Sequence, residues 1–267
     1  MLTDIIVHMD RGAGCTARLM AAIDLASRHG GRLKGLYVIT HPHYTSSSSY
    51  LSDFAQVREF FVNATSKAGI ETEWLLVDWN TVGTPLAEIV TNHSHYADTI
   101  LVGQPTQLHS RRTNLDFHER LILGAGRPIV VFPGSGDIFQ FGERVLVAWK
   151  AGRESVRAVN DALPFLQAAT DISIVAMVTS HDNRAREEQP INLLQQHLAR
   201  HHVKAATEII VIQKGNAAEA LLEQARQKKA DLIVVGGFSY KSNRAPVLSP
   251  FTQELLLKAP VPLLISH

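Results

Sequence analysis

Short apolar runs alternate with amphipathic stretches along the whole chain. In the first half, apolar runs with the length of buried strands lie at residues 4–9, 33–39, 71–77, 99–102 and 128–132. Between them, apolar residues recur every three or four positions, which predicts helices over residues 16–29, 53–68, 83–95 and 115–123. Strands that are apolar throughout and separated by helices indicate parallel sheets covered on both faces.

The same order of elements begins again after a Pro-Gly-Ser-Gly segment at residues 133–136. The segment from Asp4 overlays the segment from Arg144 at a fixed offset of 140 residues, and a repeat of this length indicates a duplicated domain. We predict two tandem α/β domains, residues 1–137 and 138–267, each a five-stranded parallel Rossmann-like sheet. The second set comprises strands at 145–148, 172–178, 206–212, 232–235 and 262–265, and helices at 154–169 (kinked at Pro164), 190–201, 215–228 and 252–258.

Composition narrows the classes of function. Of 267 residues, 45% are hydrophobic and 19% charged, which suits well-packed cores. With 26 basic and 25 acidic residues, the net charge of +1 gives no general attraction to nucleic acid or to an anionic membrane. The N-terminus has no signal-peptide pattern, and no apolar run approaches the roughly 18 residues that span a bilayer, so we expect a cytoplasmic protein.

The stretch with the clearest chemistry follows the apolar run at 232–235. That run ends in two glycines, and a segment rich in hydroxyl groups leads to the last helix. A glycine turn between a strand and a helix commonly presents backbone N–H groups to a phosphate. The candidate ligand-binding residues here are Gly236, Gly237, Ser239, Ser249 and Thr252, with Ser242, Lys241 and Arg244 able to add contacts to an anion.

The tandem repeat, the sequence Gly236-Gly237-Phe238-Ser239 after a strand, and the terminal KAPVPLLISH resemble the universal stress protein family. The resemblance covers nearly the whole chain, once per half, and implies an adenine-nucleotide α-hydrolase-like fold. In nucleotide-binding members, a Gly-x2-Gly-x9-Gly-[Ser/Thr] loop holds the triphosphate and an Asp after the first strand helps to hold the nucleoside. The last strands of the two halves often pair in this family, which implies an intramolecular pseudo-dimer, with a homodimer as a further option.

The second half matches this pattern in spacing but not in residues. Gly236 stands at the first glycine, whereas Ser239, Ser249 and Pro250 stand at the other three positions. A serine adds a Cβ where close approach is needed, and Pro250 lacks an N–H group. Lys150 occupies the position of the Asp. The resemblance thus implies ATP as the candidate cofactor of the second domain, at a site changed at three of four loop positions.

The first half keeps a different part of the same pattern. Asp10 matches the acidic position and Gly103 the first glycine, so both are candidate binding residues. The pair at the end of the pattern is Asp116-Phe117, and a carboxylate with an aromatic ring is poorly suited to phosphate. We therefore expect weaker nucleotide binding in the first domain than in the second.

Other motifs point to other chemistry with less support. Gly12-Ala13-Gly14-Cys15-Thr16-Ala17 fits a dinucleotide fingerprint, but no acidic residue closes the second strand. The 13 histidines have no partners at a recognised metal spacing, so we predict no metal site, and His8 is expected in the core. Cys15 is the one cysteine and is expected to be a buried, inert thiol. No G-x-S-x-G elbow and no clear acid–base pair is present.

These patterns favour a non-enzymatic universal stress protein that acts in a stress response by binding a small molecule or a partner, with weak or lost ATP binding. Two alternatives stay open. One is an ATP-binding sensor or slow ATPase that uses the second domain. The other is a dinucleotide-dependent enzyme that uses the loop from Gly12 to Gly14.

Overall fold

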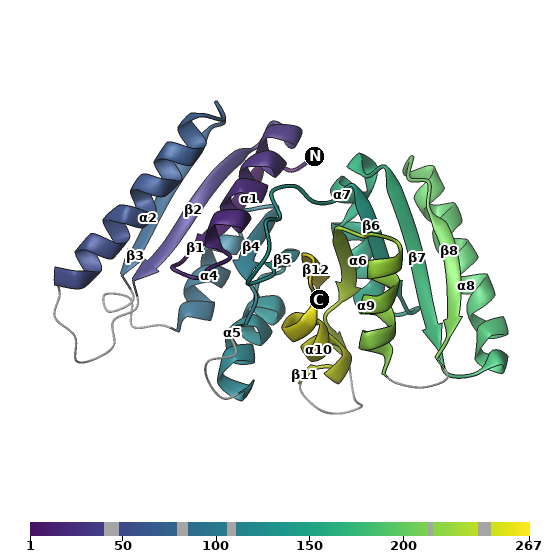
Figure 1. Ribbon diagram of the computed structural model, residues 1–267. Helices are drawn as coiled ribbons and strands as arrows, with labels where there is room; N and C mark the ends of the chain where they lie inside the picture. The colour runs from purple at the N-terminus through teal and green to yellow at the C-terminus, as the bar shows by residue number, and fades with distance from the viewer. Residues whose placement is uncertain (40–47, 79–84, 106–110, 213–215, 240–246) are drawn as a thin grey trace. The chain divides into compact units, whose positions relative to one another are not determined.

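The structure is a computed structural model that describes residues 1–39, 48–78, 85–105, 111–212, 216–239 and 247–267. The chain divides into two compact units, Met1–Gln140 (unit 1) and Phe141–His267 (unit 2). In each unit, helices lie on both faces of a parallel sheet (Figure 1). The α/β fold and the repeated arrangement predicted from the sequence are confirmed.

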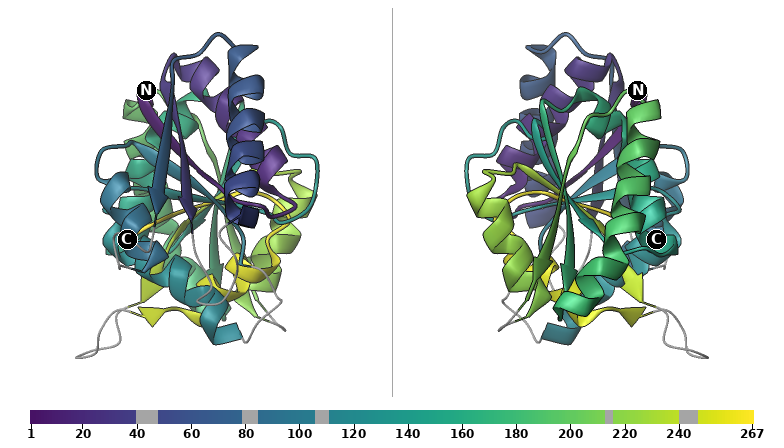
Figure 2. Two further views of the ribbon diagram at one scale, coloured as in Figure 1. Left: turned by 90° about the vertical axis from the view of Figure 1, so that its left-hand side faces the viewer. Right: turned by 90° about the vertical axis from the view of Figure 1, so that its right-hand side faces the viewer.

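Unit 1 has the strand order β3-β2-β1-β4-β5, and each neighbouring pair is parallel. Helix α2 lies along β2 (Figure 2, left). The elements are β1 (Asp4–Met9), α1 (Cys15–His29), β2 (Arg32–Ile39), α2 (Ser48–Ser66), β3 (Thr72–Asp78), α4 (Leu86–Ser94), β4 (Thr99–Gly103), α5 (Arg111–Gly124) and β5 (Ile129–Phe132).

Unit 2 repeats this topology, with the corresponding order β8-β7-β6-β9-β12. Helix α8 lies along β7 and β8 (Figure 2, right). The elements are β6 (Arg144–Trp149), α6 (Arg153–Asp161), α7 (Leu163–Ala168), β7 (Asp171–Val178), α8 (His181–Arg200), β8 (Ala206–Val211), α9 (Ala217–Gln227), β9 (Leu232–Gly236), β10 (Phe238–Ser239), β11 (Val247–Leu248), α10 (Pro250–Lys258) and β12 (Leu263–Ser266).

The central strands are buried because they are apolar on both faces. Ile5, Ile6 and Val7 of β1 are at most 1% exposed, and the run from Leu232 to Val234 in β9 is fully buried. Each such side chain contributes about 1.5–3 kcal/mol when it leaves water. Within the described residues, no helix is long and apolar enough to cross a membrane.

Three local predictions differ from the structure. Helix α2 already begins at Ser48, where the serine run was expected to be a loop. Helix α8 begins at His181 and contains Pro190, which was expected to start the helix. The side chain of Ser180 accepts a hydrogen bond from the N–H group of Asn183 and so caps α8 before the proline is reached. The kink expected at Pro164 is a full break between α6 and α7.

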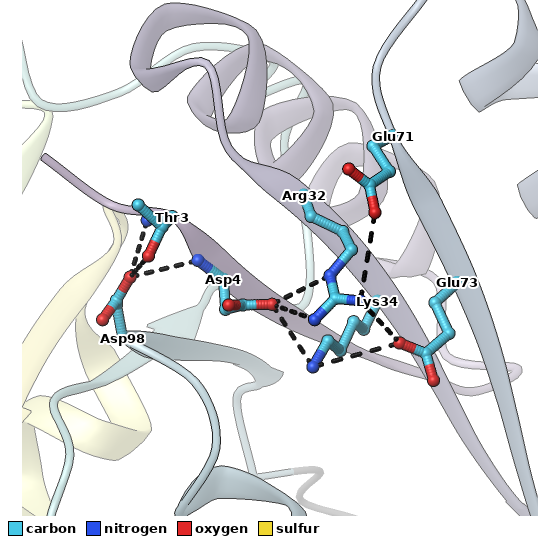
Figure 3. Close-up of polar contacts among 7 residues, drawn as sticks. All are labelled: Thr3, Asp4, Arg32, Lys34, Glu71, Glu73 and Asp98. Carbon is cyan, nitrogen blue, oxygen red and sulfur yellow. Dashed lines mark hydrogen bonds and ion pairs between the residues drawn. The ribbon is translucent and has the colours of Figure 1, made fainter.

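Polar contacts tie the amino ends of the unit 1 strands together (Figure 3). Asp4 Oδ1 accepts hydrogen bonds from Arg32 Nε and Nη2 at 2.9 and 2.7 Å, and Lys34 Nζ lies 3.3 Å from the same oxygen. Asp98 Oδ2 accepts from the N–H groups of Thr3 and Asp4 at 2.6 and 3.0 Å. Asp231 makes the corresponding contacts in unit 2, where it accepts from two backbone N–H groups at 2.9 and 3.0 Å.

Candidate functional site

A cavity of about 590 Å³ lies at the carboxyl end of the unit 2 sheet. β6 ends at Trp149 and its neighbour β9 ends at Gly236, and both residues line the cavity. The chain continues from β6 to β7 on one side and returns to β9 on the other, so the cavity lies at a topological switch point, where sheets of this kind bind ligands. The described lining residues are Ala148, Trp149, Lys150, Ala151, Gly152, Glu154, Ser155, Met177, Ala217, Val235, Gly236, Ser249 and Phe251.

The lining combines apolar surface with a few polar groups. Trp149, Met177 and Phe251 provide aromatic and thioether surface, while Lys150 and Glu154 bring opposite charges. Pockets for small molecules usually measure about 300–1,000 Å³ and have this mixed character. The cavity is therefore suited in size and chemistry to a compact ligand with an aromatic part.

Position 236 requires a glycine because the end of β9 packs closely against helix α6. A Cβ at this position would lie 2.7 Å from the backbone carbon of Glu154 and 2.9 Å from the backbone nitrogen of Ser155. The glycine thus lets the end of β9 meet the first turn of α6, whether or not a phosphate binds nearby. A bulky substitution such as Gly236→Val would disturb this packing and is a poor test of ligand binding.

The hydroxyl groups of Ser249 and Thr252 are engaged with each other at the start of α10. Ser249 caps the helix: its Oγ accepts from the Thr252 N–H group at 3.1 Å and lies 2.8 Å from Thr252 Oγ1. Ser249 still borders the cavity, whereas Thr252 is fully buried. Pro250 follows the cap at the start of the helix, where a missing N–H group is tolerated.

The other predicted loop residues are held by backbone pairing. The N–H group of Gly237 donates to the carbonyl of Ser266 at 2.9 Å. Ser239 belongs to β10 and pairs with Val247 of β11, an antiparallel pair that the sequence did not predict. Lys241, Ser242 and Arg244 lie outside the described residues. Among the described residues that line the cavity, Gly236 and Ser249 were predicted as binding residues.

Two cavity-lining residues that the sequence did not single out carry unsatisfied polar atoms. Glu154 Oε1 and Trp149 Nε1 are shielded from solvent and have no hydrogen-bond partner among the described residues. Buried polar atoms are rarely left unpaired in native proteins, so each calls for an explanation. Both residues lie at or just after the carboxyl end of β6, and the rule that ligands bind at strand ends was the signal that could have found them.

In unit 1, the side chain of Arg18 lies between the ends of β1 and β4, at the corresponding edge of the sheet. Arg18 is 2% exposed, donates from Nε to the carbonyl of His8 at 3.0 Å, and donates from Nη2 to Asp10 Oδ2 at 2.6 Å. Asp10 Oδ1 also accepts from the N–H group of Gly12 at 2.7 Å. The predicted binding residue Asp10 is thus engaged by its own unit.

Gly103, the other predicted residue of unit 1, lies against the same arginine. A Cβ at Gly103 would lie 2.6 Å from Arg18 Nη1, and the Gly103 carbonyl is 2.7 Å from His118 Nε2. In unit 2, alanines stand at the positions of His8 and Arg18, because the offset of 140 residues leads to Ala148 and Ala158. Small residues thus stand in unit 2 where unit 1 has two large side chains beside the ends of β1 and β4.

His8 and Cys15 are both buried, as predicted. Burial lowers the pKa of His8 to about 4, because the interior solvates the imidazolium poorly, although Asp10 acts in the opposite direction. Burial also raises the pKa of the Cys15 thiol, although the residue begins helix α1. Across the described ranges, no three His, Cys, Asp or Glu side chains gather as a metal site.

The Gly12–Gly14 loop is explained by contacts within unit 1. Gly12 lies against Asp10, and a Cβ at Gly14 would lie 2.7 Å from the carbonyl oxygen of Pro133. The glycine at position 14 therefore allows the start of α1 to approach the chain that leaves β5. This packing accounts for the glycine of the fingerprint without a dinucleotide.

Comparison with known proteins relates unit 2 to a protein family. Residues 143–267 match the model of the Universal stress protein family. Unit 2 is a universal stress protein domain. A comparison with curated proteins gave no match.

Solved structures resemble the chain over nearly its whole length. A universal stress protein from Archaeoglobus fulgidus aligns with 99% of this chain and 98% of its own, at a TM-score of 0.74 and 15% identity. A protein of unknown function from Pseudomonas aeruginosa aligns with 99% of this chain and 92% of its own, at a TM-score of 0.64 and 14% identity. The cytoplasmic domain of a prokaryotic cation chloride cotransporter aligns with 99% of this chain and 95% of its own, at 0.51 and 14%. At these identities the likeness shows the fold.

Proposed function

We propose that unit 2 binds a small molecule in the cavity at the carboxyl end of its sheet, and that the protein acts in a stress response through this binding rather than through catalysis. The observation that carries the proposal is that Lys150, Gly236 and Ser249, from three separate segments, border one cavity at the switch point of the sheet. Membership of unit 2 in the universal stress protein family supports an adenine-containing ligand.

The cavity suits a nucleoside better than a triphosphate. Trp149 and Phe251 offer apolar surface for a base. For phosphates, Pro250 has no N–H group, and the Ser249 hydroxyl already caps α10. Among the described lining residues, Lys150 supplies positive charge while Glu154 supplies negative charge. ATP would therefore be held mainly by its nucleoside part, and we expect it to bind weakly.

Calorimetric titration of the full chain with adenosine, AMP and Mg-ATP tests this proposal. We expect Lys150→Ala to weaken the binding of AMP more than that of adenosine, because Lys150 is positioned to meet a phosphate. Lys204→Ala is the matched control, since Lys204 is exposed next to the amino end of β8. If none of the three ligands binds, the proposed ligand class is wrong.

A second set of variants tests why ATP binds weakly. Ser249→Gly with Pro250→Ser restores the last two residues of the family pattern, and glycine replaces a serine cap at a cost of only a few tenths of a kcal/mol. We expect this double variant to bind Mg-ATP about tenfold more tightly, a change of about 1.4 kcal/mol. Micromolar ATP binding with hydrolysis by the unmodified chain would instead favour the sensor or slow ATPase, and a response to NAD would favour the dinucleotide enzyme.

A further inference from the structure

We propose that Glu154 sets the ligand specificity of the unit 2 cavity: it selects an uncharged or cationic molecule that donates a hydrogen bond, and it disfavours polyphosphates. This inference rests on the proposed function, because it concerns the same cavity. It adds a residue that decides which members of the ligand class are accepted.

The first support is the unsatisfied carboxylate. Glu154 lines the cavity, and its Oε1 has no hydrogen-bond partner among the described residues. An ionised carboxylate only accepts hydrogen bonds, so its missing partner must be a donor. The residue as a whole is half-buried and borders the cavity, so its negative charge acts on any ligand bound there.

The second support is that the backbone holds Glu154 in place. A Cβ on Gly236 would lie 2.8 Å from Glu154 Cβ and 2.7 Å from its backbone carbon, so the end of β9 packs directly on this residue. Glu154 also lies in the first turn of α6. The backbone of Glu154 is therefore held at the cavity wall, and its carboxylate extends from a fixed position. Gly236 is a positioning residue for this carboxylate.

The third support is an aromatic side chain in the same wall. Trp149 is 8% exposed and borders the cavity together with Phe251. A nitrogen heterocycle could lie against this apolar surface while it donates a hydrogen bond to the carboxylate. Nucleosides have this character, whereas a polyphosphate offers acceptors and repels Glu154.

A different role for Glu154 makes a different prediction. A carboxylate in the first turn of a helix is stabilised by the helix dipole, whatever binds nearby. If that were its only role, Glu154→Gln would lower the melting temperature and leave the order of ligand affinities unchanged. Ligand preference and melting temperature therefore have to be measured on the same variants.

The experiment is calorimetric titration of the full chain, Glu154→Gln and Glu188→Gln with adenosine and Mg-ATP, together with the melting temperature of each protein. Glu188→Gln removes the same charge from an exposed position on α8 and serves as the control. We expect Glu154→Gln to bind adenosine about tenfold more weakly, because a charge-assisted hydrogen bond is lost. We expect it to bind Mg-ATP about tenfold more tightly, because a repulsion is lost. Glu188→Gln should change neither affinity.

The outcomes separate this inference from the proposed function. If adenosine and ATP both bind and Glu154→Gln changes neither affinity, or both in the same direction, the specificity role is overturned while the binding function stands. If the unmodified chain binds ATP but not adenosine, the specificity role and the preference for a nucleoside are both overturned, while the binding of a small molecule by unit 2 stands. If no ligand binds any of the three proteins, both are wrong.

Discussion

Asp10 and Arg18 form an ion pair in unit 1, but removing Asp10 should lower the free energy of unfolding by more than removing Arg18. The Arg18 side chain is 2% exposed and the Asp10 side chain 34% exposed, and the Nη2–Oδ2 distance is 2.6 Å. Asp10→Asn removes the carboxylate and leaves a guanidinium buried without its counter-charge. Arg18→Met removes the guanidinium, fills much of its volume, and leaves a carboxylate that water can reach.

The expected magnitudes follow from these exposures. Removing one partner of a buried ion pair costs about 3–5 kcal/mol when the remaining charge stays buried, which applies to Asp10→Asn. After Arg18→Met, Asp10 keeps the hydrogen bond from the Gly12 N–H group and regains water, so we expect a cost of about 1–2 kcal/mol. The difference between the two variants is thus about 2 kcal/mol.

The assay is urea denaturation of the full chain combined with hydrogen exchange of peptides from β1 and α1, which reports on unit 1 specifically. Arg226→Met is a control, because Arg226 pairs with Glu223 on the exposed surface of α9 and its loss should have little effect. Equal costs for Asp10→Asn and Arg18→Met, or a higher cost for Arg18→Met, would refute the assignment of the buried charge to Arg18.

Further predictions concern packing, pH and reactivity. Gly236→Ala should destabilise unit 2 by about 1–3 kcal/mol in urea denaturation, whereas Gly134→Ala, at a position with open space around the absent Cβ, should be close to neutral. Burial lowers the pKa of His8 from 6.5 in the unfolded chain to about 4, so the free energy of unfolding should fall by about 3 kcal/mol as the pH drops from 6.5 to 4. His8→Leu should flatten this part of the pH–stability curve. An unchanged slope in that variant would contradict the burial of His8. Cys15 should react with iodoacetamide far more slowly in the native protein than in urea, because its thiol is buried and its pKa is raised; equal rates would show that it is accessible.

The sequence predicted those helices and strands whose pattern of apolar residues lies within one short segment. The continuous apolar runs of β1 and β9 could only be buried strands, and the repeat placed the same elements in both halves. Pro190 misled the prediction of α8, because a proline normally marks the first turn of a helix and here lies inside one. The start of α8 depends instead on a cap at Ser180.

The candidate site depended on contacts that no local pattern reveals. Gly236 matched a phosphate-loop glycine in the sequence, yet its Cβ position faces the backbone of Glu154 across a long stretch of chain. Arg18 belonged to an apparently ordinary amphipathic helix, and charged residues on such helices are expected at the surface. Only the fold shows that Arg18 is buried beside Gly103.

The most direct test of the central claim is the number of ligands that one chain binds. We predict that calorimetric titration with adenosine gives one site per chain, because Arg18 lies buried between the ends of β1 and β4 in unit 1, whereas unit 2 has Ala158 at that position and a cavity of about 590 Å³. Ala217→Trp, which places a large side chain in the cavity wall, should abolish that binding. Two equivalent sites per chain, or binding that persists in Ala217→Trp, would contradict the account.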